Sequence, residues 1–189
     1  MAHILLTEPT PNPLAYKLRL DQAVTIGGGK QYNKKEDARD NPIAQKFFDI
    51  HGVESVYFSD DFITINKTPG GIWDFIVFQA DEILSKIEKI TPIQRGGATT
   101  GKDLGEKDFA KLAHAEKIAY IDSIINETIR PALARDGGDL QILGLEENTL
   151  RVRYQGACGS CPSATGATLN YIANMLQNRV SPDLQVIPG

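Results

Sequence analysis

The sequence predicts an α+β fold in which two small α+β domains are joined by a flexible glycine-rich linker. Short runs in both halves alternate apolar and polar residues, which is typical of half-buried strands. Other runs repeat apolar residues at intervals of three and four, which is typical of amphipathic helices. Between the halves, glycines and polar residues leave little to bury. We therefore expect domains at residues 1–90 and 108–189, with a linker at residues 91–107.

Alternation and turn residues define the expected elements of the first domain. Asn41 and Pro42 suit a helix start, and Gly52 suits its end. Two apolar runs separated by three polar residues have the pattern of a hairpin. The expected elements are a strand at Leu14–Leu20, a helix at Pro42–Gly52, hairpin strands at Val53–Phe58 and Phe62–Lys67, and a helix at Trp73–Ile87.

The second domain repeats this mixture of helices and strands. Pro131 follows an isoleucine stripe at helical spacing, so it should end or kink that helix. The expected elements are a helix at Ile118–Ile129, hairpin strands at Leu140–Leu145 and Thr149–Tyr154, a helix at Ser163–Asn178, and a strand at Leu184–Ile187.

Composition excludes several classes of protein. The chain has 189 residues, 41% hydrophobic and 23% charged, which is ordinary for a globular protein of one large or two small domains. A net charge of −4, without a basic stripe, argues against nucleic-acid binding. The apolar run Ile4–Leu6 is too short for a signal peptide or a membrane span. We therefore expect neither a nucleic-acid nor a membrane partner.

Both cysteines of the chain, Cys158 and Cys161, lie in one Gly/Ser-rich stretch between an expected strand and an expected helix. Pro162 suits the first turn of that helix, whose free N–H groups would favour thiolate over thiol. Two buried, inert thiols are the least favoured interpretation, because glycine and serine are poor core material. A redox dithiol, a zinc site and an iron-sulfur cluster all fit the spacing. Since the metal sites usually need four protein ligands, either would require two chains to share one site.

Other candidate sites are weaker. The segment Gly96–Lys102 resembles a nucleotide-binding P-loop, but Asp103 stands where a Ser or Thr should hold magnesium. The segment Asp136–Asp139 is typical of a turn in which aspartates make local hydrogen bonds. The histidines have no zinc-like spacing to the cysteines: His3, His51 and His114.

Motifs in both halves of the chain resemble those of a known family. The second half resembles the NifU-like C-terminal domain of iron-sulfur cluster assembly proteins, through Arg130-Pro131, Asp136–Asp139, Gly156–Ser163 and Thr168-Leu169. The first half resembles the N-terminal domain of the Nfu subfamily, through Thr7–Pro13, Gly52-Val53, Asp61–Ile65 and Trp73. Together the two resemblances cover nearly the whole chain.

The resemblance implies a non-enzymatic iron-sulfur cluster carrier. Members of this family hold a [4Fe-4S] cluster between two subunits, each giving one Cys-x-x-Cys pair, and pass it to apo-proteins. Residue by residue, only Cys158 and Cys161 match the cluster ligands. The implied partners are a second copy of the chain, recipient apo iron-sulfur proteins and an upstream assembly scaffold. A [2Fe-2S] cluster is the alternative cargo, and a thiol-disulfide oxidoreductase using the same pair is the alternative function.

The resemblance also implies a location. Mitochondrial members of the family carry a targeting presequence, whereas Thr7 of the N-terminal motif closely follows Met1. We therefore expect a bacterial cytoplasmic protein without a targeting sequence, with a processed form as the alternative.

Overall fold

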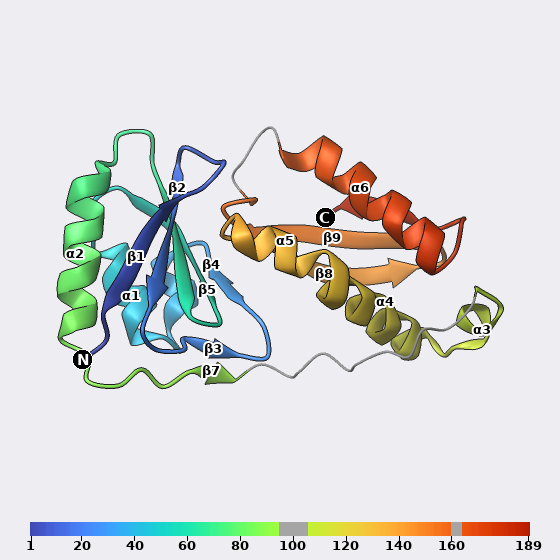
Figure 1. Cartoon of the computed structure of the whole chain (residues 1–189), viewed down its shortest axis with the longest axis horizontal. Helices are drawn as coiled ribbons and strands as arrows, with labels where there is room; N and C mark the ends of the chain where they lie inside the picture. Colours follow the sequence, from blue (N-terminus) through green and yellow to red (C-terminus); the bar gives the residue numbers. More distant parts are fainter. Residues whose placement is uncertain (95–105, 160–163) are drawn as a thin grey trace.

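The chain forms two α+β units in a computed structural model that describes residues 1–94, 106–159 and 164–189 (Figure 1). The N-terminal unit, residues 1–94, and the C-terminal unit, residues 106–189, each contain their own hydrophobic core. Both contain helices and largely antiparallel strands, which confirms the predicted α+β class. The predicted limits at residues 90 and 108 stay a prediction. Segment 95–105, with most of the expected linker and the P-loop-like stretch, lies outside the described residues.

The N-terminal unit is built on an antiparallel sheet with strand order β1-β2-β6-β5-β4. Helices α1 and α2 pack on one face of this sheet, where Phe47, Ile76 and Leu84 join the core. Its elements are β1 (Ile4–Pro9), β2 (Ala15–Leu20), β3 (Thr25–Ile26), β4 (Lys30–Tyr32), a 3₁₀ turn (Lys35–Ala38), α1 (Pro42–Phe48), β5 (Val53–Ser59), β6 (Phe62–Lys67), α2 (Trp73–Ser85) and β7 (Ile93–Gln94).

Helix α1 begins where the sequence predicts. The side-chain oxygen of Asn41 accepts hydrogen bonds from the backbone N–H groups of Ile43 and Ala44, at 3.0 and 3.2 Å. Pro42 occupies the first turn, where its missing N–H costs nothing.

Four strands of this unit were not predicted: β1, β3, β4 and β7. Ile4–Pro9 forms edge strand β1, which pairs with β2, and an edge position tolerates the terminal proline. Ile93–Gln94, inside the expected linker, forms β7 and pairs in parallel with β3. The paired structure of the N-terminal unit therefore continues past residue 90.

The other face of this sheet carries a row of polar side chains. Lys17, Thr64, Tyr57 and Gln31 lie directly opposite one another on the neighbouring strands β2, β6, β5 and β4. Residues opposite each other in adjacent strands point to the same face. This set, called the polar row below, faces the C-terminal unit.

The C-terminal unit is a sheet of strand order β10-β9-β8 covered by helices. Ile121 and Ile125 of α4, with Ile172 and Leu176 of α6, are buried in its core. As predicted, the isoleucine helix ends before Pro131. Helix α5, which begins at Arg130, was not predicted. The elements of this unit are α3 (Glu106–Lys111, not predicted), α4 (His114–Thr128), α5 (Arg130–Arg135), β8 (Gly138–Glu146), β9 (Thr149–Gly156), α6 (Ala164–Arg179) and β10 (Gln185–Pro188).

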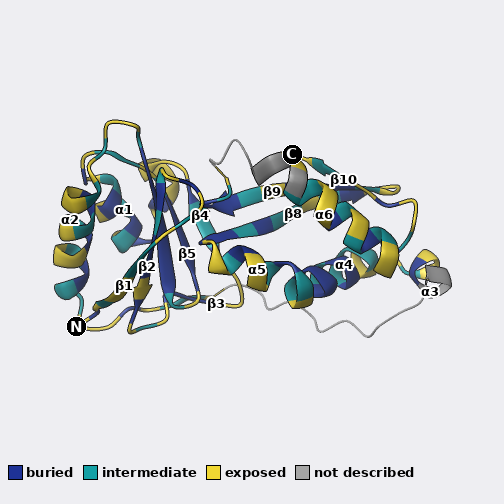
Figure 2. Cartoon of the chain, turned by 45° about the horizontal axis from the view of Figure 1, so that its top comes forward, coloured by how far each residue is buried: buried dark blue, intermediate teal, exposed yellow. Residues whose placement is uncertain are grey.

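The β8–β9 hairpin directs the chain to the first cysteine. Gly138, the first residue of β8, pairs with Gly156, the last residue of β9, at the open end of the hairpin. Figures 1 and 2 show this end of the C-terminal unit against the sheet of the N-terminal unit. None of the described helices combines the length and the apolar character that crossing a membrane would require.

Candidate functional site

Cys158 lies two residues beyond the end of β9 and is half-buried. Its side chain packs on the backbone of β8, so closely that a Cβ added at Gly138 would lie 2.4 Å from Sγ. Ala157, beside it, is buried. Cys161, the other predicted ligand, lies outside the described residues, as does Pro162. The structure therefore defines the surroundings of Cys158.

Tyr154 is a neighbour of this sulfur. Burial raises the pKa of Tyr154 to about 12, and the nearby Cys158 contributes to that rise. The Tyr154 hydroxyl therefore stays protonated at neutral pH, and Cys158 keeps an uncharged aromatic neighbour.

The chain turns sharply just before Cys158. Gly156 has a φ of 62°, a backbone conformation that side chains other than glycine rarely adopt. A Cβ at this position would also lie 2.3 Å from the carbonyl oxygen of Gly137. That same oxygen accepts a hydrogen bond from the Ala157 N–H at 3.0 Å. We call the stretch that begins at Gly156 and carries the cysteines the cysteine loop. Its base is thus hydrogen-bonded to the turn that precedes β8.

The N-terminal unit holds the same loop base from the other side. Asn12 donates from Nδ2 to the carbonyl oxygen of Ala157 at 3.0 Å. Gln31 accepts at Oε1 from the N–H of Gly156 at 2.9 Å, and Asn66 donates from Nδ2 to the Gly156 carbonyl oxygen at 3.3 Å. Both main-chain groups of Gly156 and the next carbonyl are therefore bonded to side chains of the other unit.

Two further contacts hold the turn before β8 and the end of α5, the helix that leads into it. Thr64 donates from Oγ1 to the carbonyl oxygen of Gly137 at 2.7 Å. Lys17, only 4% exposed, donates from Nζ to the carbonyl oxygen of Ala134 at 2.9 Å. Burying an ammonium group is costly unless it is well bonded. Glu8, 3.5 Å away, and the ring of Phe62, 4.7 Å away, provide further compensation.

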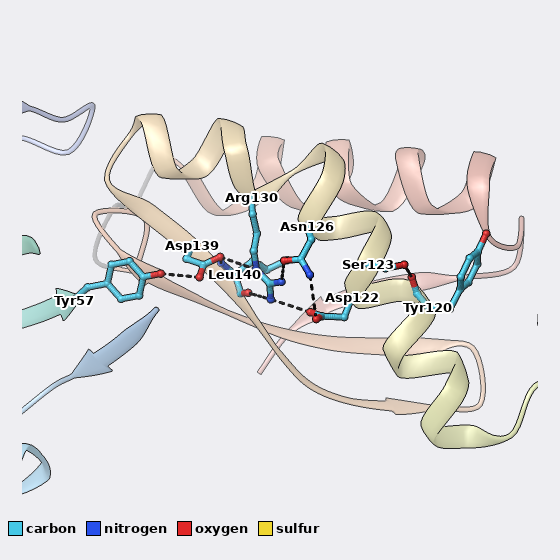
Figure 3. Close-up of polar contacts among 8 residues, drawn as sticks. All are labelled: Tyr57, Tyr120, Asp122, Ser123, Asn126, Arg130, Asp139 and Leu140. Atoms are coloured by element: carbon cyan, nitrogen blue, oxygen red, sulfur yellow. Dashed lines mark hydrogen bonds and ion pairs between the residues drawn. The ribbon is translucent and has the colours of Figure 1, made fainter. Parts of the chain in front are cut away.

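Arg130 organises a third cluster of contacts, drawn in Figure 3. Its guanidinium donates to Asp139 at 3.0 Å, to Asp122 at 2.9 Å and to Asn126. Burial opposes its charge, but the two carboxylates outweigh it and raise the pKa of Arg130. The arginine therefore fastens α4, α5 and β8 together beneath the cysteine loop.

Tyr57 connects this cluster to the N-terminal unit. Its hydroxyl donates to Oδ2 of Asp139 at 2.6 Å (Figure 3). Burial, the negative charge of Asp139 and this hydrogen bond together raise the pKa of Tyr57 well above its usual value. The sequence predicts only local hydrogen bonds for Asp139. It makes one, from the Leu140 N–H at 2.7 Å, but it also joins the two units.

A cavity of about 670 Å³ lies beside this cluster, between the units. Arg130, Asp122 and Asp139 are among its lining residues, together with the glycine loop at residues 27–29. Because Arg130 is already bonded to both carboxylates, its charge is committed to holding the fold. We therefore assign this cluster a structural role.

The histidines do not assemble into a site. All three are exposed and lie on different elements: His3, His51 and His114. Within the described ranges, no group of three or more His, Cys, Asp or Glu side chains is placed to hold a metal ion.

Comparison with known proteins matches each unit to a known domain family. The family described as "NifU-like domain" matches residues 121–187, and the family described as "Scaffold protein Nfu/NifU N terminal" matches residues 4–90. The chain belongs to the Nfu/NifU family. The order of its two units is therefore N-terminal Nfu domain, then NifU-like domain, as the motifs predict.

Several relatives carry informative names. The "NFU1 iron-sulfur cluster scaffold homolog, mitochondrial" of Drosophila sechellia is 33% identical over 90% of this chain and 59% of its own length. The "NifU-like protein 4, mitochondrial" of Arabidopsis thaliana is 30% identical over 93% of this chain and 62% of its own length. This Nfu/NifU chain therefore spans about 60% of the length of these relatives.

Solved structures also match. The NifU-like protein of Saccharomyces cerevisiae is 30% identical and covers 46% of this chain and 77% of its own, with a TM-score of 0.42. A Staphylococcus aureus protein, SAV1430, is 21% identical and covers 43% of this chain and 96% of its own, with a TM-score of 0.39. Each covers less than half of this chain.

The expected location in a bacterial cytoplasm is wrong. The relatives named above are mitochondrial proteins of a fly and a plant. The expectation depended on how closely the N-terminal motif follows Met1. Because the chain matches only part of each longer relative, that position does not locate the protein.

Proposed function

We propose that this Nfu/NifU chain is an iron-sulfur cluster carrier that binds a [4Fe-4S] cluster between two subunits and delivers it to apo-proteins. The fly relative is named as an iron-sulfur cluster scaffold, which supports a role in cluster assembly without catalysis. The observation that carries the finer proposal is the number of cysteines. The chain has two, whereas such clusters normally take four cysteine ligands, about two per chain in a dimer.

Cys158 and Cys161 are the proposed ligands. Cys158 lies in a turn at the open end of a hairpin, half-buried and packed against backbone. Such a position leaves the sulfur near the surface, where a second subunit could approach. The two chains together would then supply four thiolates, and an upstream scaffold and recipient apo-proteins would be the partners that exchange the cluster.

Anaerobic reconstitution with iron and sulfide tests this proposal. We expect a coloured product with about four iron atoms per two chains, which elutes as a dimer, while the apo-protein elutes as a smaller species. Cys158→Ser and Cys161→Ser should each abolish iron binding, whereas the matched control Ser160→Ala, in the same loop, should retain it. A colourless product, or a cluster bound to a strict monomer, would refute the shared site. An iron-to-chain ratio of about one would indicate a [2Fe-2S] cluster instead.

The oxidoreductase alternative is tested on the same preparations. It predicts turnover of a disulfide substrate that is lost in Cys158→Ser. If the wild type turns over the disulfide substrate no faster than Cys158→Ser does, the oxidoreductase function is ruled out.

A further inference from the structure

We propose that the polar row, with Asn12 and Asn66 beside it, is a clamp by which the N-terminal unit shapes the cysteine loop and thereby controls how tightly the cluster is held. This inference rests on the proposed function for its second half, the control of the cluster. Its first half, the shaping of the loop, stands on the contacts alone.

The clamp acts on main-chain atoms immediately before the first cysteine. Gln31 bonds the Gly156 N–H, Asn66 bonds the Gly156 carbonyl, and Asn12 bonds the Ala157 carbonyl. These three groups precede Cys158 by one or two residues. Their partners come from a different unit, so the loop path leading to the sulfur depends on docking between the two units.

Two of the three clamping amides, Asn12 and Asn66, are buried, and Gln31 is half-buried. Asn12, Asn66 and Thr64 are 2%, 1% and 0% exposed. Asn12 is bound in its own turn, where its Oδ1 accepts from the Leu14 N–H at 3.0 Å. Buried amides held in this way present their polar atoms in one geometry, so they preorganise what they touch.

The contact between the N-terminal and C-terminal units is of a kind that can open. Among the described residues, the two hydrophobic cores share no member, and the contacts between the units named above are hydrogen bonds. Each hydrogen bond gains little net free energy, because water replaces it when the units separate. An interface of this kind is closer to a transient contact than to a shared core.

Opening the clamp would remove the acceptor of the Gly156 N–H and one of the two donors to its carbonyl oxygen, which also accepts from the Gly159 N–H at 3.2 Å. The turn would then gain conformational freedom, and binding a cluster through Cys158 would have to restrict that freedom again. The clamped protein therefore retains its cluster longer, and undocking of the N-terminal unit favours release. Gln31 and Asn66 are positioning residues, since they act on Cys158 through the backbone.

Amide hydrogen exchange in the full-length apo-protein tests the clamp without any cluster. Gln31→Ala removes the acceptor of the Gly156 N–H, and we expect exchange at that amide to become about five to ten times faster, the change for one hydrogen bond. Gln31→Glu keeps an oxygen acceptor and should stay near the wild-type rate. Gln79→Ala, on α2 at the far side of the N-terminal unit, is the matched control (Figure 1).

Loss of iron to a chelator from the reconstituted protein tests the second half. We expect Gln31→Ala and Asn66→Leu each to shorten the half-time of iron loss by about fivefold, with Gln79→Ala unchanged. Unchanged exchange at Gly156 in Gln31→Ala would overturn the clamp. Faster exchange with an unchanged half-time would overturn its control of the cluster. Failure of the wild type to take up iron would instead refute the proposed function, and with it the control of release, while the exchange result would still decide whether the clamp exists.

Discussion

Replacing Gly138 by alanine would place a methyl group too close to the sulfur of Cys158. The added Cβ would be 2.4 Å from Sγ, 3.1 Å from Cβ of Cys158 and 3.2 Å from the carbonyl oxygen of Gln155. The first distance is about 1 Å short of a normal contact of ~3.5 Å. Rotating the cysteine side chain relieves only that contact, because the other two involve atoms held by the backbone. We therefore expect the loop to shift, at a cost of about 1–3 kcal/mol, typical of overpacking.

Urea unfolding of the apo-protein, followed by circular dichroism, measures this cost. Gly144→Ala is the matched control, because it lies on the same strand and an added Cβ there meets no atom within 4 Å. We expect the control to stay within about 0.5 kcal/mol of the wild type. Iron bound after reconstitution should fall in Gly138→Ala and not in Gly144→Ala, since the displaced sulfur is a proposed ligand. Equal unfolding free energies and equal iron contents in the two variants would refute the close packing of Cys158 on β8.

Three further predictions concern polar contacts within and between the two units. Arg130→Leu should cost about 1.5–3 kcal/mol by urea unfolding, because it leaves two half-buried carboxylates without their charged hydrogen-bond donor. Arg151→Leu, which loses an exposed ion pair 3.7 Å long, should cost at most ~1 kcal/mol, and equal costs for the two variants would contradict the role assigned to Arg130. Tyr57→Phe should cost about 1 kcal/mol at neutral pH, from one lost hydrogen bond. Because the folded-state pKa of Tyr57 lies above the ordinary tyrosine pKa of about 10, the wild type binds this proton more tightly when folded. The wild type should therefore lose stability as pH rises beyond about 10, more steeply than Tyr57→Phe, and parallel curves would contradict the burial of the hydroxyl. Asn41→Ala should cost about 1 kcal/mol through loss of the α1 cap, and an unchanged melting temperature would argue against that cap.

Sequence patterns predict most elements of the fold because the signals are local. The hairpin strands β5 and β6 and the end of α4 before Pro131 were expected from alternation and from proline geometry. Strand β7 was not, because its two residues sit among glycines and polar residues and pair with a partner far away in sequence. Pairing of that kind leaves no periodic signal in the chain.

The candidate site was predicted only in part. The cysteine motif marks Cys158 directly, and the assignment of Cys158 and Cys161 as ligands stays a prediction. The polar row was missed for a physical reason. Lys17 and Thr64 alternate with apolar residues as they would on a strand facing water, and alternation cannot distinguish water from a second unit. Tyr57 and Asp139 are 82 residues apart, and no sequence pattern near either residue predicts their hydrogen bond.

The clamp contacts to Gly156 and Ala157 all reach backbone atoms, and this has a consequence for exchanging domains between proteins. A main-chain carbonyl or N–H is the same chemical group whatever side chain its residue bears. Docking of the two units is therefore selective for the path of the backbone more than for the identity of the residues along it. A chimera that joins this N-terminal unit to the NifU-like domain of a distant relative should dock normally if that domain keeps glycine at the position of Gly156.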